Sequence, residues 1–185
     1  MTGQRSWAVP VAAAAVGLVV ACFVLLLATS ETGRGNPQSI QVIGKVAPEV
    51  VATTRGGDGF DLSEWRGDWS VVNFFATWCP GCVLEHPELV EFDRRHAGDG
   101  TRLVSVVFED ELERVNEFFD DNGGDWPVLV GDTGRIATEF GVTAMPETYL
   151  ISPSGRVVTK WIGATGVTAD ALDDTIAELT ASADG

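Results

Sequence analysis

Two cysteines three positions apart, Cys79 and Cys82, are the residues whose types and spacing best indicate chemistry. They lie in the sequence Trp78-Cys79-Pro80-Gly81-Cys82, where an apolar stretch gives way to a segment of helical character. A cysteine in the first turn of a helix has its thiolate stabilised by free N–H groups and by the helix dipole. Cys82 would lie about one helical turn further on, close enough to attack a mixed disulfide at Cys79. The spacing therefore predicts thiol–disulfide exchange, in which Cys79 attacks the substrate and Cys82 resolves the mixed disulfide.

Three other uses of the cysteine pair fit the sequence less well. A zinc site needs about four ligands, and the only histidines, His86 and His96, do not have the spacing of a zinc finger. A purely structural disulfide would close a very short loop and stabilise the fold little. A peroxidase would place its attacking cysteine in a Pro-x-x-x-Thr-x-x-Cys setting, which is absent before Cys79. We therefore expect that the protein binds no metal. The Cys79–Cys82 disulfide is expected to be its only redox group.

The elements that must position the cysteines are a strand before them and a helix after them. Ser70–Ala76 is an apolar run typical of a buried central strand. Cys79–His96 is expected to be a helix, with Pro80 at an early position where its missing N–H costs nothing. The inner stripe of this helix is expected to contain Val83, Leu84, Leu89, Val90 and Phe92. His86 is expected on its surface.

Further elements follow from periodicity and turn signals, and their order predicts an α/β fold with helices packed on a central mixed sheet. Thr168 is a candidate N-cap of the last helix. A hairpin near the start of the domain would form an N-terminal β extension. The expected strands are Val50–Thr53, Phe60–Leu62, Thr101–Phe108, Pro127–Val130, Thr148–Ile151 and Val157–Ile162, and the expected helices are Glu111–Asp121, Gly134–Phe140 and Thr168–Thr180.

The first thirty residues differ from the rest in composition. Residues 7–28 contain no charged side chain, and such a run can reach about 30 Å as a helix, the thickness of a hydrocarbon core. Arg5 precedes the run, so the positive-inside rule leaves residues 1–6 in the cytoplasm. We therefore predict one transmembrane anchor at residues 7–28, a polar linker at 29–39 and an extracytoplasmic domain at 40–185.

Two alternatives to a retained anchor are open. One is a signal peptide cleaved near Ala28-Thr29-Ser30, although the apolar run exceeds the usual length of about 7–15 residues. The other is lipidation at Cys22, which follows Val19-Val20-Ala21 in a loose likeness of a lipobox. The five residues after Cys22 are all apolar, which favours a small side chain inside a helix.

The charge balance excludes one class of partner. The chain carries 27 acidic and 12 basic residues, a formal net charge of −15. Binding to nucleic acid requires clustered lysines and arginines, so we expect no nucleic-acid partner. The hydrophobic fraction of 45% and the charged fraction of 21% are ordinary for a folded protein.

Three segments resemble the thioredoxin superfamily and, within it, the membrane-anchored ResA/CcmG (DsbE)/TlpA group. Val46-Ala47-Pro48, followed by Leu62, is similar to the N-terminal extension of that group. Residues 73–82, Asn-Phe-Phe-Ala-Thr-Trp-Cys-Pro-Gly-Cys, are similar to its active-site strand and motif. Residues 141–150, with the sequence Pro-Glu-Thr at 146–148, are similar to its cis-proline loop. The resemblance runs from about Ile43 to Leu179, most of the exported part of the chain, and implies a thioredoxin-like fold there.

The resemblance also implies roles for particular residues. The Met145–Pro146 bond is expected to be cis and to face the cysteines, with the backbone of Met145 pairing with an extended substrate. Asn73 stands where ordinary thioredoxins carry a buried aspartate, and Glu85, three residues beyond Cys82, is expected to exchange protons with Cys82. The alternative for Glu85 is a solvated position on the helix surface.

Three more residues belong to the expected substrate-binding surface. Trp78 and Pro80 flank Cys79, and Trp78 is expected chiefly to shield the cysteines by packing. The side chain of Glu147 is expected either to give the substrate-binding groove negative charge or to point to solvent.

The resemblance implies a reductant of apocytochrome c disulfides in c-type cytochrome biogenesis, re-reduced by a membrane electron-donor protein. A general disulfide oxidase or isomerase of secreted proteins would use the same residues in the opposite direction. A non-catalytic thioredoxin-like binding module or metallochaperone is the alternative from another class. The direction of electron flow is open, because the reduction potentials of Cys-x-x-Cys proteins span about −270 to −120 mV.

Overall fold

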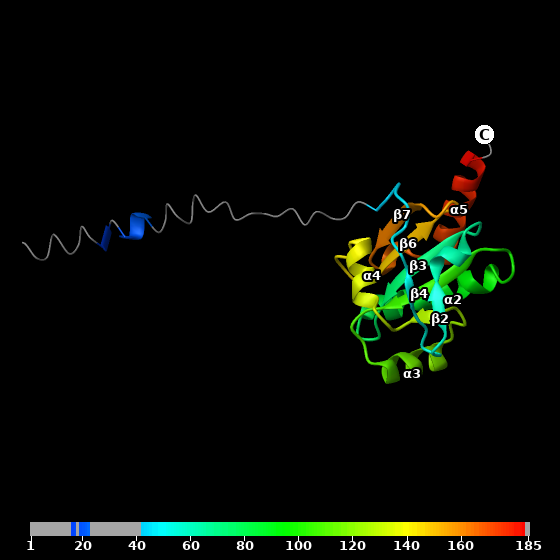
Figure 1. Cartoon of the computed structure of the whole chain (residues 1–185), viewed down its shortest axis with the longest axis horizontal. Helices are drawn as coiled ribbons and strands as arrows, with labels where there is room; N and C mark the ends of the chain where they lie inside the picture. The colour runs from blue at the N-terminus through cyan, green and yellow to red at the C-terminus, as the bar shows by residue number, and fades with distance from the viewer. Residues whose placement is uncertain (1–15, 18, 23–41, 184–185) are drawn as a thin grey trace, which may run out of the picture. The chain divides into compact units, whose positions relative to one another are not determined.

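The structure is a computed structural model that describes residues 16–17, 19–22 and 42–183 (Figure 1). The chain divides into two units, Met1–Gln38 and Ser39–Gly185. Of the predicted anchor at residues 7–28, residues 16–17 and 19–22 are described, and they are helical. Among the described residues, helices of sufficient length and apolarity to span a membrane are not found. The predicted linker at 29–39 and the cleavage site near residue 28 lie outside the described residues.

The second unit is built on a five-stranded mixed sheet, as predicted, with strand order β5-β4-β3-β6-β7. The two outer strands on one side run parallel to β3, and β6 and β7 are antiparallel to their neighbours. Every residue of β3 is buried, which agrees with its apolar sequence and central place. The strands are β3 (Ser70–Phe75), β4 (Arg102–Val107), β5 (Val128–Leu129), β6 (Glu147–Ile151) and β7 (Val157–Ile162).

Alternating side chains of the sheet divide the core between its two faces. On one face, Phe75 and its neighbours pack against the helices α2 (Pro80–Arg95), α3 (Leu112–Asn122) and α5 (Ala169–Ala183). On the other face, Phe74 packs with residues of α4 (Thr133–Phe140) and of the N-terminal hairpin. Figure 1 shows these helices around the central sheet. The predicted helix-and-sheet arrangement is confirmed.

The predicted N-terminal β extension is present as a two-stranded antiparallel sheet. It consists of β1 (Val51–Thr53) and β2 (Gly59–Asp61), joined by a glycine-rich turn. The N–H of Val130 donates to the carbonyl of Thr53 at 2.9 Å, which joins the hairpin to the chain just after β5. A 3-10 helix, η1 (Leu62–Trp65), then leads into β3.

The inner face of α2 differs from the predicted stripe. Val83 and Leu84 are 41% and 69% exposed, whereas Glu85 and His86 are buried. Because Cys82 faces inward, the 3.6-residue period brings residues 85, 86, 89 and 92 inward with it. The prediction of a surface position for His86 is therefore wrong. Its ring lies among four aromatic side chains, Phe75, Phe118, Phe119 and Trp126.

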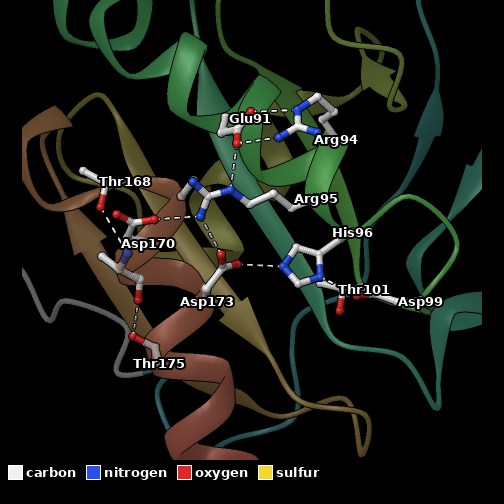
Figure 2. A network of polar contacts seen from close by, with 12 residues as sticks. Glu91, Arg94, Arg95, His96, Asp99, Thr101, Thr168, Asp170, Asp173 and Thr175 are labelled. Atoms are coloured by element: carbon white, nitrogen blue, oxygen red, sulfur yellow. Dashed lines mark hydrogen bonds and ion pairs between the residues drawn. The ribbon is translucent and has the colours of Figure 1, made fainter.

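A network of charged side chains fastens the C-terminal end of α2 to the start of α5 (Figure 2). Both ring nitrogens of His96 face carboxylates, with Nδ1 2.6 Å from Asp99 and Nε2 2.7 Å from Asp173. Burial alone would lower the pKa of His96, but these hydrogen bonds outweigh it and raise the pKa. Arg95 bonds to Asp170 and Asp173 at 2.7 and 2.8 Å. The helix that carries the cysteines is thus held at the end remote from them.

Candidate active site

The two cysteines lie at the junction between the end of β3 and the start of α2. Cys79 is the N-cap residue of α2, and its Sγ accepts a hydrogen bond from the N–H of Cys82 at 3.2 Å. Pro80 occupies the first turn, as predicted. Cys79 is 5% exposed and Cys82 is fully buried, and both are free thiols in this structure. The geometry is that required for an attacking thiol at the helix end and a shielded resolving thiol behind it.

The environment of Cys82 keeps its thiol protonated. Burial raises the pKa of Cys82 far above its ordinary value. The hydrogen bond with Cys79 and the negative charges of Cys79 and Glu85 raise it further. Cys82 therefore requires a nearby base before it can act as a nucleophile.

The loop before β6 lies against the cysteine motif. The Met145–Pro146 bond is cis, as the family resemblance implied. A Cβ added to Gly81 would lie 3.0 Å from Cδ of Pro146, so the glycine permits the close approach of the two segments. Pro146 is buried and Met145 is half-buried. The motif and the proline loop, far apart in sequence, therefore face each other.

Glu85 lies on the inner face of α2 one turn beyond Cys82. Its side chain is 1% exposed, and Oε1 accepts a hydrogen bond from Nδ2 of Asn73 at 2.6 Å. Oε2 is buried without a hydrogen-bond partner among the described residues. Burial raises the pKa of Glu85 to about 7, against the opposing effect of the Asn73 hydrogen bond. The alternative of a solvated surface position for Glu85 is therefore excluded.

We expect the substitution Glu85→Gln to remove a pH-dependent loss of stability. The folded pKa of about 7 lies above the ordinary 4.5, so between these values the native state binds more protons than the unfolded state. The contribution of Glu85 to the free energy of unfolding should then be largest below pH 4.5 and fall as pH rises through 7. The fall attributable to Glu85 is about 3 kcal/mol. Urea unfolding of both proteins at pH 5 and pH 8 measures it, and equal pH dependence of the two would contradict it.

Glu147 does not lie in a groove or in solvent, contrary to both sequence-based expectations. It is fully buried, and its Oε1 accepts hydrogen bonds from the N–H groups of Thr143 and Ala144 at 2.9 and 3.2 Å. Oε2 accepts from the hydroxyl of Tyr149 and from Nζ of Lys160, the latter at 3.0 Å. The carboxylate thus holds the loop that precedes Pro146.

The charge of Glu147 is stabilised in this buried position. Burial alone would raise the pKa of Glu147, but the hydrogen bonds from Tyr149, Thr143 and Lys160 outweigh it and lower the pKa. A buried carboxylate with this many donors remains ionised. Sequence reasoning found the residue but not its role, because the burial of Glu147 and its ion pair with Lys160 depend on how β6 and β7 pair.

Trp78 and Pro80 lie at the surface beside Cys79. Trp78 is 50% exposed, and its Nε1 donates to the carbonyl of Glu109 at 3.0 Å. Its ring is therefore tied to the loop after β4, and half of its surface stays open to a partner. Val83 and Leu84, on the next turn of α2, add exposed apolar area that the sequence analysis placed in the core.

Clusters of three or more histidine, cysteine or acidic side chains with metal-binding geometry are not present in the described part of the chain.

A dithiol at the start of a helix, packed against a cis-proline loop at one end of a mixed sheet, defines a thiol–disulfide oxidoreductase of thioredoxin-like fold. Residues 43–160 match the AhpC/TSA family, and the chain belongs to this family. The resemblance inferred from the sequence is confirmed.

Relatives agree with this assignment. The chain is 35% identical over 135 residues to the thiol:disulfide interchange protein DsbE homolog of Paracoccus denitrificans, covering 70% of this chain and 73% of that protein. It is 30% identical over 121 residues to the thiol-disulfide oxidoreductase ResA of Bacillus thuringiensis, covering 65% and 70%. A solved thiol:disulfide interchange protein of the thioredoxin family from Chlorobium tepidum has a TM-score of 0.66 and 27% identity, covering 72% and 94%. The protein is a thiol–disulfide oxidoreductase.

Proposed function

We propose that this protein is a reductant that opens the disulfide of a Cys-x-x-Cys-His segment of apocytochrome c before haem attachment. The thiolate of Cys79 displaces one substrate sulfur and forms a mixed disulfide with the other. Cys82 then attacks the sulfur of Cys79, so that the Cys79–Cys82 disulfide forms and the second substrate sulfur leaves. The substrate gains two electrons and two protons, and a membrane electron-donor protein returns two electrons to the pair. The Cys79–Cys82 disulfide is the only redox group that this cycle requires.

The observation that carries the proposal is the burial of Cys82 beside a buried carboxyl. Burial raises the pKa of Cys82, so its thiol becomes a nucleophile only when a base takes its proton. Glu85, with a pKa of about 7, can take that proton at neutral pH. A strong oxidant has a stabilised reduced form, and the environment of Cys82 has the opposite effect on its thiolate. This supports transfer of electrons from the protein to its substrate.

Substrate docking is assigned to Met145, Pro146, Trp78 and Pro80. Backbone hydrogen bonds of Met145 are not found among the described residues, so its N–H and C=O are free to pair with an extended segment. The open part of Trp78 and the exposed ring of Pro80 would contact residues beside the substrate cysteine. Glu147, because it is buried, is assigned to holding the loop rather than to touching the substrate.

The domain is assigned to the extracytoplasmic side of the cell membrane, tethered by residues 7–28 as a single-pass anchor. The uncharged run and the preceding Arg5 support this orientation. The relatives named as a thiol-disulfide oxidoreductase and a thiol:disulfide interchange protein support disulfide chemistry for the tethered domain.

The reduction potential of the Cys79–Cys82 couple tests the direction of electron flow. Full-length protein would be equilibrated at pH 7 in graded dithiothreitol and glutathione buffers, and its thiols trapped and counted. We expect a value near or below about −250 mV, together with reduction of an oxidised Cys-x-x-Cys-His peptide. A value near about −120 mV would mark an oxidant of secreted proteins and overturn the proposal. A pair that does not equilibrate would leave only a binding module.

A further inference from the structure

Among the described residues, Asn73 on β3 is the one side chain of the sheet that donates a hydrogen bond to the carboxyl of Glu85. Asn73 is fully buried, and its Nδ2 donates to Oε1 of Glu85 at 2.6 Å. The same nitrogen donates to Oγ1 of Thr148 on β6 at 2.9 Å. Both amide hydrogens therefore have acceptors, one on the helix of the cysteines and one on the strand that follows Pro146.

The orientation of the Asn73 amide is determined by its remaining partner. Oγ of Ser105, on β4, lies 3.5 Å from Oδ1 of Asn73 and also accepts a hydrogen bond from Nε1 of Trp126 at 2.9 Å. Because the Trp126 N–H is only a donor, the Ser105 hydroxyl is directed to Oδ1. A flipped amide would place its oxygen against the carboxylate of Glu85, so Nδ2 must face Glu85.

The two oxygens of Glu85 consequently have different environments. Oε1 accepts the hydrogen bond from Nδ2 of Asn73 whether Glu85 is ionised or protonated. A proton on Oε1 would point at this N–H donor, so the carboxyl proton is not placed there. Oε2 is buried and has no partner among the described residues. We propose that Asn73 is a positioning residue that reserves Oε1 as an acceptor and makes Oε2 of Glu85 the oxygen that exchanges the proton with Cys82.

This inference rests on the proposed role of Glu85 and makes that role more specific. In the resolving step the proton leaves Sγ of Cys82 for Oε2, and the resulting thiolate attacks Sγ of Cys79. The Cys79–Cys82 bond forms, the bond from Cys79 to the substrate sulfur breaks, and that sulfur leaves as a thiolate. The hydrogen bond from Asn73 stabilises the carboxylate form of Glu85, so it keeps the base available near neutral pH.

The test follows the reduced full-length protein, with Cys22→Ser as the common background so that only Cys79 and Cys82 react, mixed with 5,5′-dithiobis(2-nitrobenzoate) in a stopped-flow instrument. Attack by Cys79 releases the first thionitrobenzoate, and attack by Cys82 on the resulting mixed disulfide releases the second. The rate of the second release would be recorded from pH 5 to pH 9. In the wild type we expect an inflection near pH 7, and in Glu85→Gln we expect that inflection to be lost.

The substitution Asn73→Leu should move the inflection of the second release upward by about one pH unit, since it removes the donor to Oε1. The matched control is Thr148→Val, which removes the other acceptor of the same amide at an equally buried position and should leave the inflection in place. Loss of the inflection in Glu85→Gln together with an unshifted inflection in Asn73→Leu would overturn the inference and leave the proposed function standing. An unchanged profile in Glu85→Gln would overturn the role of Glu85 itself.

A measurement on the wild type keeps the inference testable if Asn73→Leu does not fold. The side-chain amide resonances of Asn73 and the carboxyl carbon resonance of Glu85 would be followed by NMR across the same pH range. We expect both to titrate with one midpoint near pH 7. Asn73 amide resonances that do not move while Glu85 titrates would overturn the inference.

Discussion

The substitution Cys82→Ser is expected to convert the protein into a trap for its substrates. Cys79 can still attack a disulfide, but a serine hydroxyl does not resolve the mixed disulfide, so the covalent complex accumulates. Catalytic reduction of the substrate disulfide should fall by more than about a thousandfold. Non-reducing electrophoresis and mass spectrometry of the trapped adducts would identify the linked cysteine, which should be Cys79.

Two variants separate this effect from general damage. Cys79→Ser should form no adduct, because the attacking thiol is gone. Cys22→Ser makes the same substitution at the third cysteine of the chain and should exchange at the wild-type rate. Turnover by Cys82→Ser at a rate near that of the wild type would contradict the assignment of Cys82 as the resolving residue.

The substitution Glu147→Gln is expected to lower both stability and exchange rate. It places an NH₂ group among the hydroxyl of Tyr149 and the ammonium of Lys160, both of which donate to Oε2 in the wild type. Removing one member of a buried ion pair lowers the free energy of unfolding by about 3 kcal/mol. The loss is smaller here because Lys160 is 20% exposed. We expect a loss of about 2–3 kcal/mol at pH 7. Chemical unfolding measures the loss, and the rate of thionitrobenzoate release measures the effect on the loop before Pro146.

The pH dependence of this loss identifies its cause. The folded pKa of Glu147 is depressed, since the hydrogen bonds and Lys160 outweigh burial. Its stabilisation is therefore present above the unfolded pKa and is lost as pH falls through the folded pKa. The difference between wild type and variant should shrink in acid. A matched control is Glu139→Gln, which removes a half-exposed partner of Arg135 and should change stability by less than about 1 kcal/mol. Equal effects of the two substitutions would contradict the role of Glu147.

The sequence was sufficient wherever the determining interactions are local. The buried strand β3, the start of α2 at the cysteine motif and the N-terminal hairpin follow from runs of apolar residues, turn residues and helix-start chemistry. Thr168 was also correctly expected to cap α5, and the N–H of Ala171 donates to its hydroxyl at 3.1 Å. Each of these signals depends on residues within a few positions of one another.

The inner face of α2 shows where hydropathy alone was misleading. Val83 and Leu84 are apolar and were expected in the core, but they lie outside. Cys82 must face inward to reach the sulfur of Cys79, and the helical period then directs Glu85 and His86 into the core. The requirement of the site, rather than the hydropathy of each residue, determines which side of the helix is buried.

The sequence by itself determined the reactive pair, the class of fold and the presence of a carboxyl one turn from Cys82. Only the tertiary structure decided what that carboxyl does, because Glu85 obtains its partner Asn73 from a strand and Glu147 obtains Lys160 from another. The raised pKa of Glu85 arises from burial, against the opposing hydrogen bond from Asn73, and neither can be read from its neighbours along the chain. The spacing of the cysteines along the sequence positions the two thiols. The packing of elements that are distant in the sequence determines which groups exchange protons with them.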